Sequence, residues 1–470
     1  MGITISAQKS IDQKVTELMA KMTLEEKIGQ LNQYNDDITA TGPITKDADK
    51  AGQVRAGKLG SILNAIGAKN TKNWQDQAMQ SRLKIPLLFG QDVIHGFRTT
   101  FPIPLGETAT WDMNLIEKSA RIAATEASAY GIHWTFAPMV DIGRDPRWGR
   151  VMEGAGEDTY LGTLVGKARV KGFQGNGLGN KDAVMACAKH FAAYGAAVGG
   201  RDYNSVDMSL RQLHETYLPP FKAVSDMGIA TFMNSFNDIN GIPATGNKYI
   251  QRDLLKGVWN FQGFVVSDWG SIGEMIPHGF AKDNKDAALK AIIAGSDMDM
   301  ESRSYTNHLA ELVKEGKVDI QLVDDAVRRI LTKKYELGLF DDPYRFINEK
   351  REKEQANNPE HRKFAREIGA KSIVLLKNEN QLLPLSPTTK KVAIIGPFAK
   401  ATVENHGFWS IAFPDDSQRI VTQFDGIKAQ LDKNSELLYA KGCNANDNDK
   451  SLFAEAVETA KKADVVIMTL

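Results

Sequence analysis

The stretch Gly263-Phe264-Val265-Val266-Ser267-Asp268-Trp269-Gly270 decides the fold. Its apolar, β-branched run is too short for a helix and is typical of a buried strand. Burying an unpaired carboxylate is costly, so a charge at the end of such a strand is seldom a packing choice. In a barrel of parallel strands, this strand end carries the chemistry. We therefore expect Asp268 to be a catalytic group and Trp269 to form a flat wall beside a substrate.

Short apolar runs of the same kind alternate with helix-like segments along most of the chain. The runs cover 60–64, 85–89, 134–140, 183–188 and 229–234, and 296–300 has the character of another strand end. The helix-like segments cover 114–130, 210–226, 286–294 and 319–337, and a capping box at 23–26 predicts a helix near the start. Strands alternating with helices predict a parallel α/β architecture. About seven or eight such units predict a (β/α)8 TIM-type barrel over residues 1–345.

A region of different character follows the expected barrel. The segment 342–359 is rich in charge, Asn and Pro, which is typical of a linker, and a helix is expected over 361–376. We therefore expect a linker and connecting helix over 346–388. Apolar strands at 391–396 and 464–470, with an amphipathic helix at 452–462, predict an α/β sandwich domain over 389–470. With so few strands, we expect only the N-terminal part of that domain here.

Composition narrows the function classes. The 470 residues carry 58 Lys plus Arg and 58 Asp plus Glu, so the net charge is zero and a nucleic-acid partner is not expected. No apolar run is long enough to predict a membrane span, and no positively charged segment followed by an apolar one predicts a signal peptide in this chain. Cys187 and Cys443 are too few for a disulfide framework. No metal-binding or phosphate-loop motif is present, so no metal site is expected.

Polar side chains follow several of the apolar runs, which predicts a polar pocket at one face of the barrel. The candidates that follow such runs are Asp92, Arg150, Lys189, His190 and Asp268. Structural alternatives stay open for each kind of residue. Asp92 could cap a turn, and Lys189 and His190 could be a chance pair at the rim. A surface salt-bridge cluster could be formed by Arg144, Asp145, Arg147 and Arg150, although we favour a functional role for Arg150. Met233 is most simply a core residue whose sulfur could line an apolar side of the pocket.

Taken together, Met22–Gln30, Asp145–Arg150, Lys189–Phe191 and Ser267–Trp269 resemble glycoside hydrolase family 3, within it the periplasmic β-glucosidases of bacteria. The resemblance implies a (β/α)8-type barrel followed by an α/β sandwich, no cofactor, and a periplasmic or secreted location. It implies a retaining, exo-acting β-glucosidase that removes terminal glucose from oligosaccharides or aryl glucosides.

The same resemblance implies a role for each candidate. Asp268 matches the nucleophile of the retaining mechanism, and Asp92 matches the carboxylate that binds the hydroxyls farthest from the cleaved bond. The other matched positions contact the sugar through hydroxyls or an apolar face: Arg150, Lys189, His190, Arg201, Met233 and Trp269.

Two departures from the family pattern stand out. Phe236 occupies a position where many relatives carry Tyr, so one hydrogen bond near the nucleophile is expected to be lost. The family takes its acid/base glutamate from the second domain, so that residue is expected beyond Leu470. We assign the role to none of Glu153, Glu157 and Glu301.

Several rival functions remain open. A β-xylosidase or a family 3 enzyme of mixed specificity is the nearest alternative, and a sugar-binding form with little turnover is another. A Schiff-base aldolase built on Lys189 is a rival enzyme class. The loop Lys189–Gly195 lacks the second histidine of the family's N-acetylglucosaminidases, so that activity is not expected. The sequence leaves the preferred linkage and the oligomeric state open.

Overall fold

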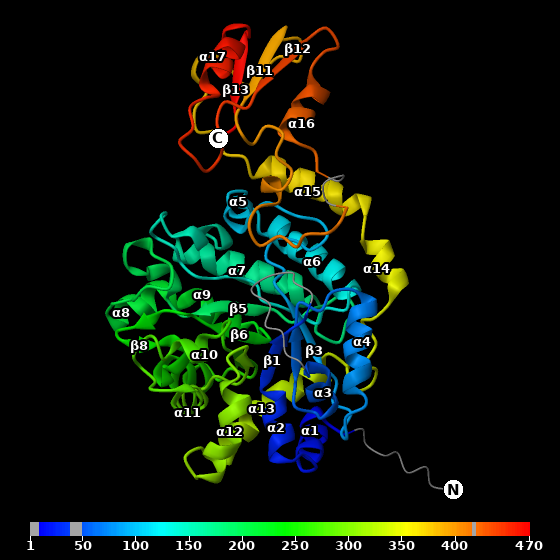
Figure 1. Ribbon diagram of the computed structural model, residues 1–470, viewed down its shortest axis with the longest axis vertical. Coiled ribbons are helices and arrows are strands. Elements are labelled where there is room, and N and C mark those ends of the chain that lie inside the picture. Colours follow the sequence, from blue (N-terminus) through cyan, green and yellow to red (C-terminus); the bar gives the residue numbers. More distant parts are fainter. Residues whose placement is uncertain (1–8, 38–48, 416–419) are drawn as a thin grey trace. The chain divides into compact units, whose positions relative to one another are not determined.

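The computed structural model describes residues 9–37, 49–415 and 420–470, and the chain forms two compact units. Unit 1 is Met1–Ser372 and unit 2 is Ile373–Leu470. Both combine helices with parallel strands, which confirms the predicted two-domain α/β organisation (Figure 1). The first eight residues, where a signal peptide would begin, lie outside the described part.

Unit 1 contains two parallel sheets and one short hairpin. The first sheet has the order β10-β1-β2-β3-β4, the second has the order β5-β6-β9, and β7 pairs antiparallel with β8. The strands are β1 (Asn32–Asn35), β2 (Ser61–Leu63), β3 (Leu88–Gln91), β4 (Trp134–Thr135), β5 (Cys187–Phe191), β6 (Thr231–Asn234), β7 (Asp238–Ile239), β8 (Ile242–Pro243), β9 (Phe264–Val266) and β10 (Asp299–Met300). The first and last strands pair through Asn32 and Asp299.

Single parallel bridges connect the two sheets at both of their edges. Trp134 of β4 bridges to Met185 just before β5, and Val266 of β9 bridges to Met298 just before β10. The indole of Trp134 packs edge-on against Phe264, with ring centroids 5.1 Å apart, and donates a 2.8 Å hydrogen bond to Thr231. These contacts place a buried core between strands of both sheets.

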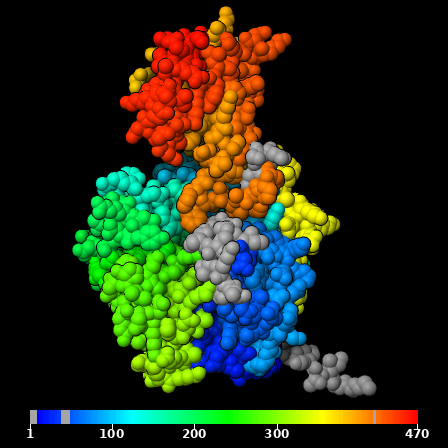
Figure 2. Space-filling view, viewed as in Figure 1, coloured from blue at the N-terminus to red at the C-terminus, as the bar shows by residue number. Residues whose placement is uncertain are grey.

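Helices connect the strands of unit 1. They are α1 (Ile11–Met19), α2 (Leu24–Gln30), α3 (Lys50–Arg55), α4 (Ala68–Ala78), α5 (Pro104–Thr108), α6 (Met113–Ala129), α7 (Thr159–Gln174), α8 (Leu210–Gln212), α9 (Pro219–Asp226), α10 (Ser271–Glu274), α11 (Asn284–Ala294), α12 (Ser304–Lys314), α13 (Ile320–Glu336), α14 (Glu349–Gln355) and α15 (Pro359–Lys371). The predicted capping box is confirmed, because Thr23 and Glu26 exchange side chain-to-backbone hydrogen bonds at the start of α2. Helices α1 and α2 pack beside α13, and α2 also packs against α12, so the blue atoms of this early segment border the yellow-green atoms of a much later one (Figure 2).

Three of the differences between the structure and the sequence prediction concern β1, the segment 210–226 and the expected linker. Strand β1 was not predicted, because its residues Asn-Gln-Tyr-Asn are polar although all four are buried. The helix expected over 210–226 is not continuous. It consists of α8 and a π-helical turn over Leu213–Tyr217, and α9 then begins at Pro219. The segment expected to be a linker carries α14, whose Glu352 accepts a hydrogen bond from the Ala68 amide of α4.

Helix α15 contacts α6 and the loop after β3 through one buried carboxylate. His361 lies 2.7 Å from the buried carboxylate of Glu126, which also accepts hydrogen bonds from the amides of Arg98 and Thr99. Glu126 therefore joins α15 to the loop that follows β3.

In its described residues, unit 2 combines a small parallel sheet with two α-helices and two short 3-10 turns. The strand order is β12-β11-β13, with β11 (Lys391–Ile395) in the centre, β12 (Glu436–Ala440) on one side and β13 (Val465–Met468) on the other. The helices are α16 (Gln423–Gln430) and α17 (Phe453–Lys461). The strands predicted near 391 and 464 and the helix near 452 are confirmed, whereas β12 was not predicted. Among the described residues, none of the helices is both long and apolar enough to cross a membrane.

Candidate active site

The end of β9 places Asp268, and its neighbour β10 fixes the backbone there. The Ser267 amide donates to the Met298 carbonyl at 2.8 Å, and the Gly270 amide donates to the Met300 carbonyl at 2.9 Å. Gly270 has a φ of 69°, a left-handed conformation that favours glycine, and it starts helix α10. The chain thus turns sharply after the strand and leaves the Asp268 side chain at the strand end.

Asp268 is a buried carboxylate with one oxygen held and the other open. The Trp269 amide donates a 2.6 Å hydrogen bond to Oδ1. Oδ2 lies 3.5 Å from His190 Nε2 and has no hydrogen-bond partner among the described residues. Burial raises the pKa of Asp268 to about 6, although the cations of Arg150 and Lys189 act in the opposite direction. The carboxylate is therefore ionised at neutral pH and has a free lone pair.

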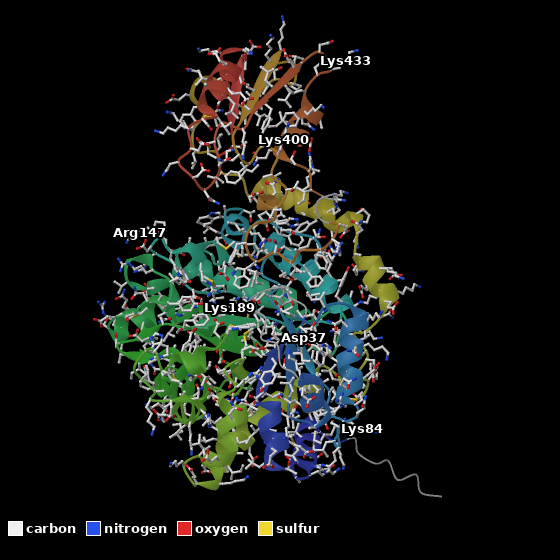
Figure 3. All side chains as sticks on the ribbon, in the orientation of Figure 1. Asp37, Lys84, Arg147, Lys189, Lys400 and Lys433 are labelled. Carbon is white, nitrogen blue, oxygen red and sulfur yellow. The ribbon has the colours of Figure 1, made fainter. Side chains whose placement is uncertain are left out.

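Lys189 and His190 come from β5, and both are buried (Figure 3 labels Lys189). The Lys189 ammonium lies 3.3 Å from Asp92 and 3.9 Å from Glu153. His190 Nδ1 lies 2.8 Å from Asp141 Oδ2. The Lys189–His190 and Phe191–Ala192 peptide bonds are both cis.

Arg150 links this group from the 3-10 turn Gly149–Glu153. Its Nε donates a 2.6 Å hydrogen bond to Glu153 Oε1, and its Nη2 donates to Glu153 Oε2 at 3.2 Å. Nη2 also lies 2.9 Å from His190 Nε2. This forked pairing fixes the guanidinium plane beside His190.

Asp92 follows β3 on a loop that is held at several points. The Val93 amide donates to the Thr135 hydroxyl at 3.2 Å, and the Arg169 guanidinium donates to the Ile94 carbonyl at 2.8 Å. Arg169 is itself paired with Glu107, and both side chains are almost fully buried. The loop is therefore positioned by buried contacts rather than by Asp92 alone.

Aromatic side chains form one wall next to the charged group. Met139, Trp148, Tyr194 and Phe236 make a buried cluster, and Trp269 packs against it. The Arg150 guanidinium lies over the Tyr194 ring at 5.4 Å from the ring centroid, and the Tyr203 ring lies 4.5 Å from the Phe236 ring. Trp148 donates a 2.8 Å hydrogen bond to Asp202. A flat apolar wall beside cations and carboxylates suits a ligand with both hydroxyls and an apolar face.

The structure joins five of the predicted residues through short contacts and leaves others apart. The joined residues are Asp92, Arg150, Lys189, His190 and Asp268. Met233 lies on β6 opposite Val266 and belongs to the buried core of unit 1. Arg201 is exposed on the turn before Asp202, and its guanidinium makes none of the described hydrogen bonds or ion pairs to the other five.

Three carboxyl groups near this cluster were given no role from the sequence. The sequence assigns no role to Glu153, and the structure buries it against Arg150 and Lys189. Asp141 follows a predicted apolar run, as Asp268 does, and this shared position was its only sequence signal. Burial and the charge of Asp268 raise the pKa of Glu274, on α10, to about 7. Glu274 does not follow a predicted apolar run, so the sequence did not mark it as a site residue.

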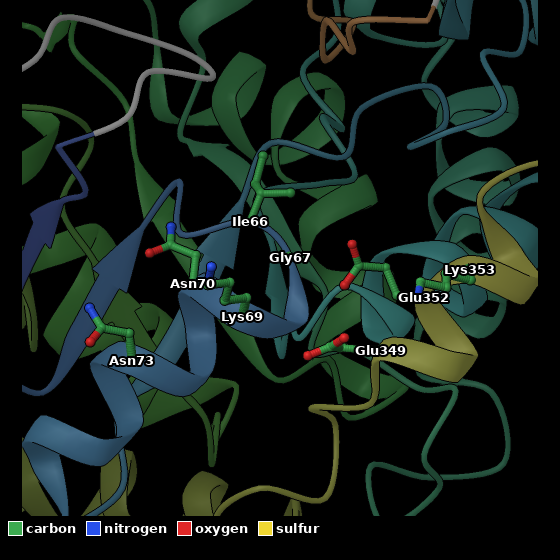
Figure 4. Close-up of a pocket in the computed structure, with 8 residues that line it drawn as sticks. All are labelled: Ile66, Gly67, Lys69, Asn70, Asn73, Glu349, Glu352 and Lys353. Atoms are coloured by element: carbon green, nitrogen blue, oxygen red, sulfur yellow. The ribbon is translucent and has the colours of Figure 1, made fainter.

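An ion pair and a pocket elsewhere on unit 1 lie apart from the cluster around Asp268. The exposed pair of Arg147 with Asp145, 2.6 Å apart, fits the surface-cluster alternative, and Figure 3 labels Arg147. Figure 4 shows a pocket between α4 and α14, lined by Ile66, Gly67, Lys69, Asn70, Asn73, Glu349, Glu352 and Lys353. None of the predicted site residues lines it.

Within 9–37, 49–415 and 420–470, no group of three or more His, Cys, Asp or Glu side chains is arranged to hold a metal ion.

Comparison with known families decides the relationship. Residues 23–333 match the N-terminal domain of glycosyl hydrolase family 3, and residues 373–470 match its C-terminal domain. The chain belongs to glycoside hydrolase family 3. The family 3 resemblance of the sequence is thereby confirmed.

Several family 3 relatives are similar over nearly the whole chain. A periplasmic β-glucosidase of Salmonella typhimurium is 41% identical over 97% of this chain, and a β-xylosidase of Formosa agariphila is 34% identical over 99%. A crystal structure of a β-glucosidase from Listeria innocua, in complex with isofagomine, is 38% identical over 97% of this chain with a TM-score of 0.91. The chain spans 62% of the Salmonella and Formosa family 3 proteins and 63% of the Listeria one.

Proposed function

We propose that this family 3 chain acts as a retaining, exo-acting β-glucosidase on terminal, non-reducing β-D-glucosyl residues. One observation carries the proposal: Asp268 presents a buried carboxylate oxygen without a described hydrogen-bond partner at a strand end beside Arg150, Lys189 and His190. An ionised oxygen of this kind suits attack on an anomeric carbon. The relatives named as β-glucosidases support the sugar specificity.

We also propose that the two sheets of unit 1 form one closed (β/α)8-type barrel. The parallel strand order and the bridges from Trp134 to Met185 and from Val266 to Met298 support this arrangement. In this proposal the barrel covers 1–345, α14 and α15 belong to a connecting region over 346–388, and 389–470 belongs to an α/β sandwich. Asp268 and its partners then lie at the carboxyl-terminal face of the barrel.

The proposed mechanism has two steps. With an activated aryl glucoside, Asp268 Oδ2 attacks the anomeric carbon, the bond to the glycosidic oxygen breaks and the aryl group leaves as the phenolate, which gives a covalent glycosyl-enzyme. Water then attacks the same carbon, the bond to Oδ2 breaks and restores the Asp268 carboxylate, and the proton of the water passes to solvent as the sugar is released. A poorer leaving group, such as the second sugar of cellobiose, additionally requires a proton donor. The cations of Arg150 and Lys189 keep Asp268 ionised for the first step.

The remaining site residues bind the sugar in this proposal. Asp92 accepts hydrogen bonds from the hydroxyls farthest from the cleaved bond, and its pairing with Lys189 keeps both groups oriented. The indole of Trp269 offers an apolar face to the ring. The further sugar contacts are assigned to Arg150, Lys189, His190, Arg201 and Met233.

Covalent trapping tests the nucleophile. A 2-deoxy-2-fluoro-β-glucoside with a dinitrophenyl leaving group should inactivate the protein, and mass spectrometry of its peptides should find the label on Asp268. Asp268→Asn should abolish turnover while glucose binding stays detectable by calorimetry, whereas Asp145→Asn, in an exposed pair, should leave both unchanged. A label on another residue, or a fully active Asp268→Asn variant, would overturn the assignment.

Leaving-group dependence tests the proton donor. Glu153 is occupied by Arg150, so we assign it no acid role. Dinitrophenyl glucoside needs no acid, whereas cellobiose does. We expect residues 1–470 to hydrolyse the first substrate far better than the second. Rates in the same proportion as for the Salmonella typhimurium relative would place an acid within these residues, and binding without turnover of either substrate would favour the sugar-binding form.

A β-xylosidase is the second candidate, because a Formosa agariphila relative named as one is 34% identical over almost all of this chain. The ratio of kcat/KM for nitrophenyl β-glucoside and β-xyloside decides between them, and a ratio below one would favour the xylosidase. The aldolase alternative predicts borohydride trapping of a carbonyl substrate on Lys189. We propose a periplasmic or secreted location because the Salmonella relative is named as periplasmic.

A further inference from the structure

His190 makes three contacts that together define where its proton lies. Nε2 lies 2.9 Å from Arg150 Nη2, Nδ1 lies 2.8 Å from Asp141 Oδ2, and Nε2 lies 3.5 Å from Asp268 Oδ2. The imidazole is fully buried, as is the Asp141 side chain. Each nitrogen therefore depends on protein partners for its hydrogen bonds.

Arg150 determines the role of Nε2. A guanidinium nitrogen donates hydrogen bonds and cannot accept them, so Nε2 must accept from Nη2. A neutral imidazole has one N–H, which must then lie on Nδ1. Burial, followed by the charges of Arg150 and Lys189, lowers the pKa of His190 well below its ordinary value, in agreement with a neutral ring.

Asp141 completes the arrangement from the other side. Its Oδ2 accepts a hydrogen bond from Nδ1 and a second one, also 2.8 Å, from the His190 backbone amide. Two donors on one oxygen fix the ring relative to its own backbone. With Nδ1 carrying the proton, Nε2 and Asp268 Oδ2 are both acceptors and form no hydrogen bond with each other.

We propose that Asp141 is a positioning residue that, with Arg150, locks His190 in the Nδ1–H tautomer and so keeps Asp268 Oδ2 free to attack the sugar. A proton on Nε2 would instead point at Oδ2 and occupy the lone pair that forms the bond to the anomeric carbon. The consequence for catalysis rests on the proposed nucleophile role of Asp268, whereas the tautomer itself does not.

The tautomer can be measured directly in the unmodified chain. In a long-range ¹H–¹⁵N spectrum of protein labelled at its eight histidines, the His190 signals are those that vanish in His190→Gln. We expect a protonated Nδ1 and an unprotonated Nε2. A proton on Nε2 would overturn the proposal, and this result would hold even if no glycosidase activity were found.

Two substitutions at Asp141 then test the positioning role. Asp141→Leu removes the acceptor and should slow the first-order inactivation by the fluoroglucoside by up to about 100-fold, the loss that a misplacement of about 1 Å in a reacting group can cause. It should also shift the His190 signals. Asp141→Asn keeps an acceptor oxygen and should recover most of the rate and the original spectrum.

A matched control and the contrary results complete the design. Asp145→Leu, on the same loop, should leave the rate and the His190 spectrum unchanged. A wild-type rate in Asp141→Leu would refute the positioning role. Equal losses in Asp141→Leu and Asp141→Asn with an unchanged His190 spectrum would show a purely structural role. If Asp141→Leu fails to fold, Asp141→Ala replaces it with the same expected and contrary results, and the wild-type spectrum still decides the tautomer.

Discussion

The acid limb of the pH–rate profile tests the electrostatics around Asp268. Only the ionised carboxylate attacks, and burial raises the pKa of Asp268 to about 6 even with Arg150 and Lys189 nearby. For an activated aryl glucoside, kcat/KM should be half-maximal near pH 6. One pH unit changes the ratio of ionised to protonated Asp268 tenfold, so kcat/KM should fall to about one tenth of its plateau at pH 5 and about one hundredth at pH 4.

Substitutions of neighbouring charges give the sign of each contribution. The Lys189 cation lowers the pKa of Asp268, so Lys189→Met should move the half-maximal point to higher pH while reducing the plateau. Glu274, whose pKa is about 7, is still largely protonated when Asp268 ionises, so Glu274→Gln should leave the limb in place. Arg147→Met removes an exposed cation paired with Asp145 and serves as the control.

The assay is kcat/KM for 2,4-dinitrophenyl β-glucoside between pH 4 and pH 8, with protein stability checked at each pH. A half-maximal point near pH 4, the value of an ordinary aspartate, would show that burial does not control this carboxylate. A downward movement in Lys189→Met would refute the assignment of Lys189 as a cation acting on Asp268. Movement in Arg147→Met would mean that the profile reports net charge rather than the site.

Three further predictions concern stability. Arg169→Met leaves the buried Glu107 carboxylate unpaired and should lower the free energy of unfolding by about 3–5 kcal/mol in urea titrations, against less than about 1 kcal/mol for the exposed Lys171→Met. Thr23→Ala removes the cap of α2 and should cost about 1 kcal/mol in the same assay, with no loss contradicting the cap. Burial lowers the pKa of Lys334 to about 7, below its value in the unfolded chain. Below pH 7 the folded state therefore bears the whole free-energy cost of burying the charged ammonium, and this cost falls as the pH rises and the amine becomes neutral. The Tm of the wild type should therefore rise relative to that of Lys334→Met between pH 7 and pH 9.5, and a constant difference would contradict this.

Much of the fold could be read from apolar runs because the strands are buried on both faces. Runs such as Gly263–Ser267 end where the backbone reaches the site, so the strand and its terminal charge were both visible in sequence. Strand β1 gave no such signal, since the buried side-chain NH2 groups of Asn32 and Gln33 donate hydrogen bonds to the Ile28 carbonyl and the Ser61 hydroxyl rather than making apolar contacts. Hydrophobic periodicity has no means of detecting a strand of this kind.

The candidate site shows a similar limit. Residues at strand ends could be proposed one by one, and the family resemblance assigned their roles. The contacts of Asp141 and Glu153 depend instead on which side chain each one meets in the folded chain, a histidine nitrogen for Asp141 and the Arg150 guanidinium for Glu153. Those distances, such as 2.8 Å from Asp141 to His190, arise from tertiary structure and have no local sequence pattern. Local periodicity likewise could not show that Arg201 would be exposed, or how far it would lie from Asp268.

The pairing of β1 with β10 has a consequence for how the chain folds during synthesis. Asn32 and its partner Asp299 are 299 − 32 = 267 residues apart. At ribosomal rates of about 5–20 residues per second, the edge of β1 waits roughly 13–53 s before its partner exists. An apolar strand left unpaired for that time would be a template for aggregation, whereas Asn32–Asn35 contains a single aromatic residue among amides. The polar composition of β1 would thus protect the nascent chain while the sheet lacks its last strand.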